Sequence, residues 1–375
     1  MYSGEIEQMM RTRPLLASLL LSVSLCYPAF AGVRKESPLD DLAWAATDVA
    51  LVTTADTEGT FEVSESWKGD LNAGEQVIVP GLRPDLDAIP ISGYPKEFKE
   101  AFRADVSRLI PRQPVGARLI LFLKCSTGTG EHARSSDCRW EPLDPTIEIK
   151  DSAVWIDGGR LFRFVQLSHP GSQFLYEVRD ETLETLRRRV AEVKNIQENI
   201  TAATTIGDGT ERAEYLKPYV RSDVYLARYA AMDELAKCGA VAVPTIRRML
   251  DDTAFVNERP DLIRTLIRAG GDSVGEDLTR HLQSELAFWT ATGPTLAKGW
   301  YLQDSIPHPP LLRHYAETLE LIRGIEETHY FPALNTVVRV RDFWRSLAQR
   351  DGTTGLPDYC DKVIVNLQAD SRQHP

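Results

Sequence analysis

The sequence predicts an α+β protein of two domains, with strands in the first half of the chain and paired helices in the second. Residues 32–179 contain short runs in which apolar and polar residues alternate, separated by Gly and Pro, as is typical of half-buried strands. In residues 180–375, apolar residues recur at helical spacing and a two-helix pattern repeats. A chain of 375 residues is also long enough to form two hydrophobic cores.

The start of the chain, residues 1–31, has the features of a signal peptide. Two arginines precede an apolar stretch, Leu15 to Tyr27, that is too short to span a bilayer, and Ala29-Phe30-Ala31 places small residues where a signal peptidase reads. We expect cleavage before Gly32 and therefore an exported protein, periplasmic or extracellular. An uncleaved membrane anchor is the alternative, but the Ala-x-Ala ending argues against it.

Alternating and β-branched runs predict the strands of the β-rich domain, residues 32–179. The predicted strands are Val49–Val52, Thr60–Trp67, Gln76–Val79, Arg118–Lys124, Ala153–Ile156, Leu161–Val165 and Phe174–Val178. Asp157-Gly158-Gly159 predicts a hairpin turn, and Leu39 to Ala46 has helical character. The Pro-rich segment 84–114 interrupts the strand rhythm. We interpret it as an insertion over one end of a small barrel or sandwich, and favour a cap on the core over a functional loop.

Four segments within about residues 42–124 carry a resemblance to known proteins. They are Ala50–Val52, Phe61–Val63 followed by Trp67–Asp70, Gly74–Val77, and Gly116–Leu123. Together they resemble small bacterial exported β-domains that are similar to the OB-like fold of netrin and tissue-inhibitor modules. The Pro-rich insertion departs from that pattern. The resemblance implies a fold and not an activity.

Four cysteines remain after the predicted cleavage, and an even number suggests disulfides in an oxidising compartment. Cys125 and Cys138 flank a polar loop rich in Gly, Ser and Thr, which predicts a bridged hairpin. Closing a loop of this size stabilises a protein by about 3 kcal/mol in the chain-entropy model. Cys238 lies in a helical segment, where a buried thiol and a bridge to Cys360 are both open. The spacing matches no standard zinc-ligand pattern.

Two adjacent segments of the helical domain, Arg228–Gly239 and Val243–Asp252, form a helix-turn-helix pattern in which Gly239 ends the first helix and Pro244 begins the second. The pattern repeats once clearly, up to Leu282, and a third, weaker copy runs from near Leu312 to about Leu347. It resembles compact HEAT-like repeats, which implies helical hairpins that stack into a solenoid. An ordinary helical bundle is the alternative.

The correspondence between copies defines the register. Leu235 corresponds to Leu266, an offset of 31 residues, and Ile246 to Leu278, an offset of 32. At the turn, Gly239 corresponds to Gly270. In the third copy, Phe331–Leu334 echoes Val243–Ile246.

An insertion at residues 290–310 separates the second copy from the third. It contains Trp300 and Tyr301, which we name as candidate partner-binding residues because aromatic side chains are enriched at interfaces. Aromatic side chains also pin a loop onto its own domain, and this alternative is the favoured one.

One catalytic motif matches, because Gly271-Asp272-Ser273-Val274-Gly275 has the G-x-S-x-G pattern of a nucleophile elbow. That elbow needs a strand before the serine. The preceding segment, Asp261 to Ala269, has helical spacing instead. We therefore interpret Ser273 as a helix N-cap, with Glu276 completing a capping box, and assign no catalytic residue.

No cofactor or metal is expected. The sequence has no phosphate loop and no dinucleotide fingerprint. His308 and His314 come nearest to a metal pattern, but their spacing fits neither a helical pair nor a zinc finger. The net charge of −11 argues against nucleic acid as a partner. No segment after residue 31 is long and apolar enough to form an integral membrane segment.

Three functions remain open on these observations. The leading one is a non-enzymatic exported protein that binds an unknown protein or peptide in the bacterial cell envelope, since solenoids present extended surfaces. A secreted serine hydrolase that uses Ser273 is one alternative. An inhibitor-like module that acts on a secreted protease is the other.

Overall fold

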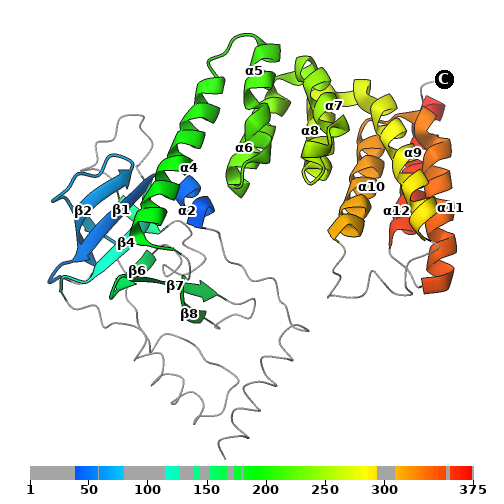
Figure 1. The fold of residues 1–375 in the computed structure, drawn as a ribbon. Helices are drawn as coiled ribbons and strands as arrows, with labels where there is room; N and C mark the ends of the chain where they lie inside the picture. Colours follow the sequence, from blue (N-terminus) through cyan, green and yellow to red (C-terminus); the bar gives the residue numbers. More distant parts are fainter. Residues whose placement is uncertain are drawn as a thin grey trace, which may run out of the picture. The chain divides into compact units, whose positions relative to one another are not determined.

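The chain folds as two compact units. The structure, a computed structural model, describes residues 39–57, 59–79, 115–126, 139–142, 153–166, 173–178, 181–293, 309–351 and 355–373. The units are Met1–Gln197 and Glu198–Pro375. The first contains an antiparallel sheet and the second is helical, so the predicted α+β layout of two parts is confirmed (Figure 1). The predicted signal peptide, 1–31, and the Pro-rich insertion, 84–114, lie outside the described residues.

An antiparallel sheet organises the first unit. Its strands are β1 (Asp48–Thr54), β2 (Thr60–Lys68), β3 (Gln76–Ile78), β4 (Arg118–Ser126), β5 (Arg139–Pro142), β6 (Ala153–Asp157), β7 (Arg160–Gln166) and β8 (Gln173–Glu177). The order is β3-β2-β1-β4-β6-β7-β8, and β5 pairs with the last residues of β4. Since β3 and β8 end this order without pairing to each other, the described strands form an open sheet and do not show the predicted barrel.

The predicted local elements of this unit are confirmed with one addition. Each predicted strand is present, and the helical character before β1 corresponds to helix α2 (Leu39–Ala45). The hairpin turn joins β6 to β7, where Asp157 pairs with Arg160. The two residues between them, Gly158 and Gly159, have φ of +55° and +81°, as a type I′ turn requires. Strand β5 was not predicted.

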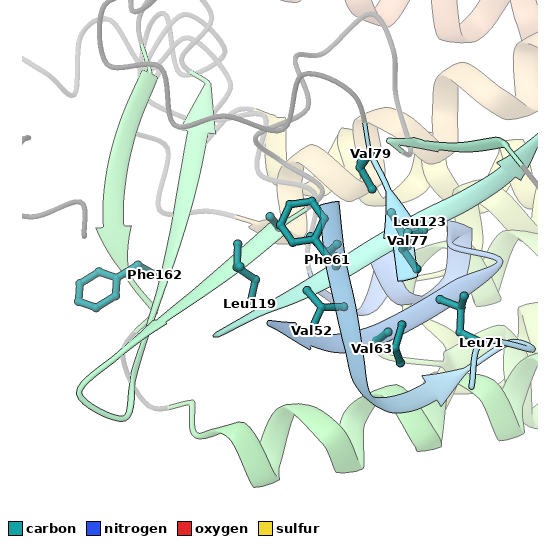
Figure 2. Packing of buried hydrophobic residues seen from close by; sticks show 12 residues of the cluster. Val52, Phe61, Val63, Leu71, Val77, Val79, Leu119, Leu123 and Phe162 are labelled. Carbon is teal, nitrogen blue, oxygen red and sulfur yellow. The ribbon is translucent and has the colours of Figure 1, made fainter. Parts of the chain in front are cut away.

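One face of the sheet carries an apolar core, part of which is drawn in Figure 2. Its buried members are Ala50, Val52, Phe61, Val63, Leu71, Val77, Val79, Leu119, Leu121, Leu123, Ala153 and Phe162. In β2, Phe61 and Val63 are buried while Glu62 and Ser64 are exposed. This is the alternation that the sequence predicts, because successive side chains of a strand point to opposite faces.

Helix α4 (Leu183–Ala203) begins in the first unit and packs there. Its buried residues in that unit are Leu186, Val190 and Val193. Arg189 donates hydrogen bonds of 2.9 and 2.7 Å to the two carboxylate oxygens of Asp40 in α2. Through these contacts α4 belongs to the first unit, which reaches Gln197.

Helix pairs build the second unit. The helices are α5 (Gly209–Leu216), α6 (Tyr225–Lys237), α7 (Val243–Asp251), α8 (Arg259–Gly270), α9 (Gly275–Thr292), α10 (Pro309–Glu327), α11 (Leu334–Asp351) and α12 (Leu356–Gln373). We call α6, α8 and α10 the A helices, and α7, α9 and α11 the B helices. Helix α8 contacts both α6 and α10, and α9 contacts α11, so the pairs stack (Figure 1). None of the helices that the structure describes combines the length and apolar character needed to cross a membrane.

Short 3₁₀ segments join each A helix to its B helix, namely η6 (Gly239–Ala242), η8 (Gly271–Val274) and η11 (Phe331–Ala333). Gly239 has φ of +69° at the end of α6, and Pro244 lies in the first turn of α7, as predicted.

Two predicted registers are wrong at these turns. In the second pair, α8 runs on through Gly270, and the residue with positive φ is Gly271. In the third pair, Phe331 and Pro332 lie in the 3₁₀ segment and α11 begins only at Leu334. The segment that the sequence matched to Val243–Ile246, Phe331–Leu334, therefore begins three residues before the observed start of α11.

Candidate functional site

The B helices repeat one pattern of buried and exposed residues. Counted from Val243, Gly275 and Leu334, the third and fourth residues of each helix are buried, and the second, sixth and ninth are exposed. This agreement identifies the equivalent residues of the three helices, although their sequences share few identities.

The third residue of each B helix is polar, buried and bonded to a helix that precedes it. These residues are Thr245, Asp277 and Thr336. The hydroxyl of Thr245 donates to Glu214 of α5 at 2.6 Å. Nε of Arg247 in α7 donates to Asp277 at 2.9 Å, and Gln283 of α9 donates to Thr336 at 3.3 Å. These bonds satisfy polar groups whose burial would otherwise destabilise the unit.

The sixth residue of each B helix is an exposed arginine. Arg248, Arg280 and Arg339 occupy this position, and we call them the arginine row. The side chains of Arg248 and Arg280 are 58% and 57% exposed. The three arginines therefore occupy equivalent, exposed positions of the three B helices.

A second group of polar residues is buried between A and B helices. Glu285 of α9, and His314 and Glu317 of α10, each offer one potential metal-ligand atom, and these atoms lie within 4.8 Å of one another. The residues Glu285 and Glu317 are only 6% and 4% exposed. We call the three residues the buried cluster. Across the described ranges, no other three such residues meet this spacing.

Hydrogen bonds assign the proton on the His314 ring. Nδ1 lies 3.0 and 2.9 Å from the two carboxylate oxygens of Glu285, and Nε2 lies 3.2 Å from a terminal nitrogen of Arg313. Since arginine can only donate, Nε2 accepts, and Nδ1 carries the hydrogen that is donated to Glu285. The ring also stacks on Phe288, with centroids 3.6 Å apart.

Glu317 is paired with two guanidinium groups, but loosely. Nε of Arg313 lies 3.2 Å from one carboxylate oxygen, and Arg259 approaches the other to 4.0 Å. Neither approach has hydrogen-bond geometry, so Oε1 of Glu317 accepts no hydrogen bond from any described residue. Burial, together with the nearby carboxylate of Glu285, raises the pKa of Glu317 to about 7.

The charges around the buried cluster disfavour a metal ion. Two carboxylates and an imidazole are suitable ligands for Zn²⁺. The guanidinium groups of Arg259 and Arg313, however, lie beside Glu317 and would repel a divalent ion held there. The two guanidinium groups already balance the two carboxylates. We therefore interpret the cluster as an ion network that fixes α10 to α8 and α9.

Ser273 is not the N-cap of α9. It lies in η8, and its hydroxyl donates to the carbonyl of Gly270 at 2.7 Å. The N-cap residue is Val274, which supplies no side-chain hydrogen bond. The predicted capping box with Glu276 is wrong because the 3₁₀ turn moves the helix start beyond the serine. The element before Ser273 is helix α8, not the strand that a nucleophile elbow needs.

Several other residues named from the sequence lie outside the described residues, namely Trp300, Tyr301, His308 and Cys138. Strands β4 and β5 form an antiparallel pair, with Cys125 opposite Trp140. The bridge from Cys125 to Cys138 stays a prediction. Cys238 and Cys360 are free thiols.

Sequence reasoning missed both the buried cluster and the arginine row. His314 and Glu317 have the i, i+3 spacing that places two side chains on one helix face, and this was an available signal. Arg248 and Arg280 are separated by 32 residues, the predicted offset of the second helix. Arg339 joins the row only in the observed register of α11.

Comparisons with protein-family models, with curated protein sequences and with solved structures find no match to this chain.

Proposed function

We propose that the chain is a non-enzymatic exported protein of the bacterial cell envelope that binds a protein or peptide partner. The observation that carries the proposal is the arginine row. A polar residue that recurs in the interior of stacked helices contributes to packing, as Thr245, Asp277 and Thr336 do. An exposed arginine at the same position of three helices contributes little to packing. Arginine is also among the residues most enriched at protein interfaces.

We further propose that the helix pairs are HEAT-like repeats and that the sheet is the described part of an OB-like domain. The stacked pairs and the polar bonds between successive B helices support the first assignment. A small antiparallel sheet in which β1 lies between β2 and β4 supports the second. In this arrangement the repeats supply the extended binding surface.

The two alternative functions have less support. For the hydrolase, the Ser273 hydroxyl is engaged with the carbonyl of Gly270, and the element immediately before it is helix α8 and not a strand. For the inhibitor-like module, the only argument is the resemblance of the sheet domain, and a fold alone does not specify an activity.

A cross-linking experiment on the mature chain, residues 32–375, tests the binding function. A photo-cross-linking residue is placed at Arg280 in the arginine row. A matched variant carries it at Arg323, an arginine of α10 that is also 57% exposed and pairs with Glu327. With an envelope extract, we expect one defined protein to be cross-linked from position 280 and not from position 323.

Two results would contradict this function. One is the same set of proteins cross-linked from both positions. The other is fluorophosphonate labelling of Ser273 in a sample that retains no partner, which would support the hydrolase.

Mass spectrometry of the secreted protein tests export. We expect an intact mass that corresponds to a start at Gly32, and a linked peptide that contains Cys125 and Cys138. A start far from Gly32, or an added lipid mass, would contradict the proposed processing.

A further inference from the structure

The buried cluster lies where the third helix pair meets the second. His314 and Glu317 belong to α10, and Glu285 belongs to α9. Helix α10 packs on both α8 and α9. We propose that the buried cluster makes this packing pH-dependent: Glu317 holds a proton while α10 is packed, and release of that proton promotes the opening of α10 from α8 and α9. This inference does not depend on the proposed binding function.

Two carboxylates approach each other closely inside this contact. An oxygen of Glu285 and an oxygen of Glu317 lie within 4.8 Å of each other, and the two residues are only 6% and 4% exposed. Like charges at this separation repel each other, most strongly where water is excluded. One proton shared by the pair removes the repulsion, so the packed state favours a single protonated carboxylate.

The hydrogen bonds indicate which carboxylate carries the proton. Both oxygens of Glu285 face Nδ1 of His314, at 3.0 and 2.9 Å, which stabilises the charged form. Oε1 of Glu317 accepts no hydrogen bond from any described residue, although Nε of Arg313 lies 3.2 Å away. Arg259 approaches the other oxygen to 4.0 Å. A charged Glu317 lacks the hydrogen bonds that would replace its hydration, so this residue takes the proton.

Opening of α10 releases the proton because it exposes Glu317 to water. An exposed Glu317 titrates near its ordinary pKa of 4.5, whereas burial, and then the charge of Glu285, raises its pKa to about 7 in the packed state. The packed state therefore binds more protons than the opened state between these values, and packing weakens as pH rises from about 4.5 to about 7. The groups that face Glu317 are Arg259 from α8, Glu285 from α9, and Arg313 and His314 from α10 itself.

A histidine of α9 acts in the opposite direction. Burial lowers the pKa of His281 below its ordinary value of 6.5. The packed state of His281 therefore binds fewer protons than an exposed histidine, and its titration weakens packing as pH falls. A loss of packing with rising pH cannot come from His281.

The third helix pair can open without unfolding of the remaining helices. In stacked repeats each pair contacts only its neighbours, so one interface can open while the others persist. Helix α12 packs on α10 and on α11, which keeps these three helices together. Apolar contacts also hold α10 in place, because Ile267 and Leu278 lie so near Gly324 that a Cβ there would collide with them. The proton therefore shifts an equilibrium in which the packed state predominates.

Hydrogen exchange with mass spectrometry on the mature chain, residues 32–375, measures this opening. Peptides of α10 are compared at pH about 5.5 and about 8, below and above the raised pKa, after correction for the intrinsic exchange rate. We expect their protection to fall about tenfold or more between the two conditions, since each unit of pKa difference corresponds to a factor of ten. Peptides of α6 and α7, in the first pair, are the internal reference and should change by less than about twofold.

Variants of α10 assign the effect to one carboxylate. Glu317→Gln cannot release a proton, so the protection of its α10 should differ by less than about twofold between the two conditions. Glu327→Gln is the matched control, because Glu327 is an exposed carboxylate of the same helix that pairs with Arg323. This control should keep the pH dependence of the wild type.

Three results would overturn the inference. The first is equal protection of α10 in the wild type at both pH values, a result that does not require any variant to fold. The second is a fall in protection that α6 and α7 share, because the whole unit and not α10 would then open. The third is a fall that Glu317→Gln retains, which would assign the proton to another group.

Discussion

The buried cluster and the arginine row are both sets of three polar residues in the helical unit, and they differ in burial and in how far each member depends on a partner within the chain. In the buried cluster, Glu285 accepts from His314, and Glu317 lies between two guanidinium groups of the same chain. In the arginine row, at least one member, Arg339, has no ion pair within the described chain. Burial forces a polar group to find its partner inside the protein. On the surface this requirement is absent, because water solvates an exposed charge, and Arg339 is tolerated without an ion pair to the described residues.

This difference predicts that a substitution in the buried cluster lowers the stability of the protein strongly. Glu317→Ala removes a buried carboxylate and leaves Arg259 and Arg313 with less compensation, so we expect the free energy of unfolding to fall by about 3 kcal/mol, the lower end for a broken buried pair. Urea denaturation measures it. Arg280→Ala is the matched control and should change stability by no more than about 0.5 kcal/mol. Similar losses for both variants would abolish the distinction between cluster and row.

The pH dependence of stability sharpens the comparison further. In the unfolded chain Glu317 titrates near its ordinary pKa of 4.5, and in the folded chain near 7. Between these pH values the folded state binds more protons than the unfolded state, so this residue makes stability fall as pH rises from about 4.5 to about 7. The groups that face it are Glu285, His314, Arg259 and Arg313.

Glu317→Gln cannot titrate and should lose this component. The measurement is the difference between wild-type and variant urea midpoints over that pH window. If the urea midpoints of Glu317→Gln and of the wild type change in parallel over this pH range, titration of Glu317 does not contribute to stability. Arg339→Gln is the control, and its midpoints should run parallel to those of the wild type.

A smaller effect is expected where a polar side chain caps a helix. Asp208 accepts hydrogen bonds from the amides of Thr210 and Glu211 at 2.7 and 3.0 Å, so Asp208→Ala should cost about 1 kcal/mol. Ser273 caps no helix, and Ser273→Ala should cost less than about 0.5 kcal/mol. Thermal or urea unfolding of the two variants compares them. A cost for Ser273→Ala equal to that for Asp208→Ala would restore the capping role that the sequence predicts.

The smallest effect on stability is expected from the row itself. Arg339→Gln removes an exposed charge without an ion pair to the described residues, so its melting curve should match that of the wild type within about 0.5 kcal/mol. A larger loss would mean that the residue has a structural role. The arginine row would then no longer be a surface left open for a partner.

Local patterns in the sequence were sufficient for most elements of the fold. Alternation placed Phe61 and Val63 on the buried face of β2, and glycines with positive φ ended α6 and formed the β6–β7 turn. Strand β5 escaped prediction because Arg139–Pro142 is too short to show a period; its pairing with β4 creates it. Such elements depend on a neighbour and not on their own residues.

The sequence by itself determined the strands other than β5, the order of the helix pairs and the offset of 32 residues that makes Arg248 and Arg280 equivalent. Only the tertiary structure decided where α11 begins, and therefore that Arg339 completes the row. It also decided that Glu285 meets His314, a residue 29 positions away across an insertion. The physical reason is that periodicity reports which face of a helix is buried, whereas the contact between two faces depends on how helices pack after the chain has turned back on itself.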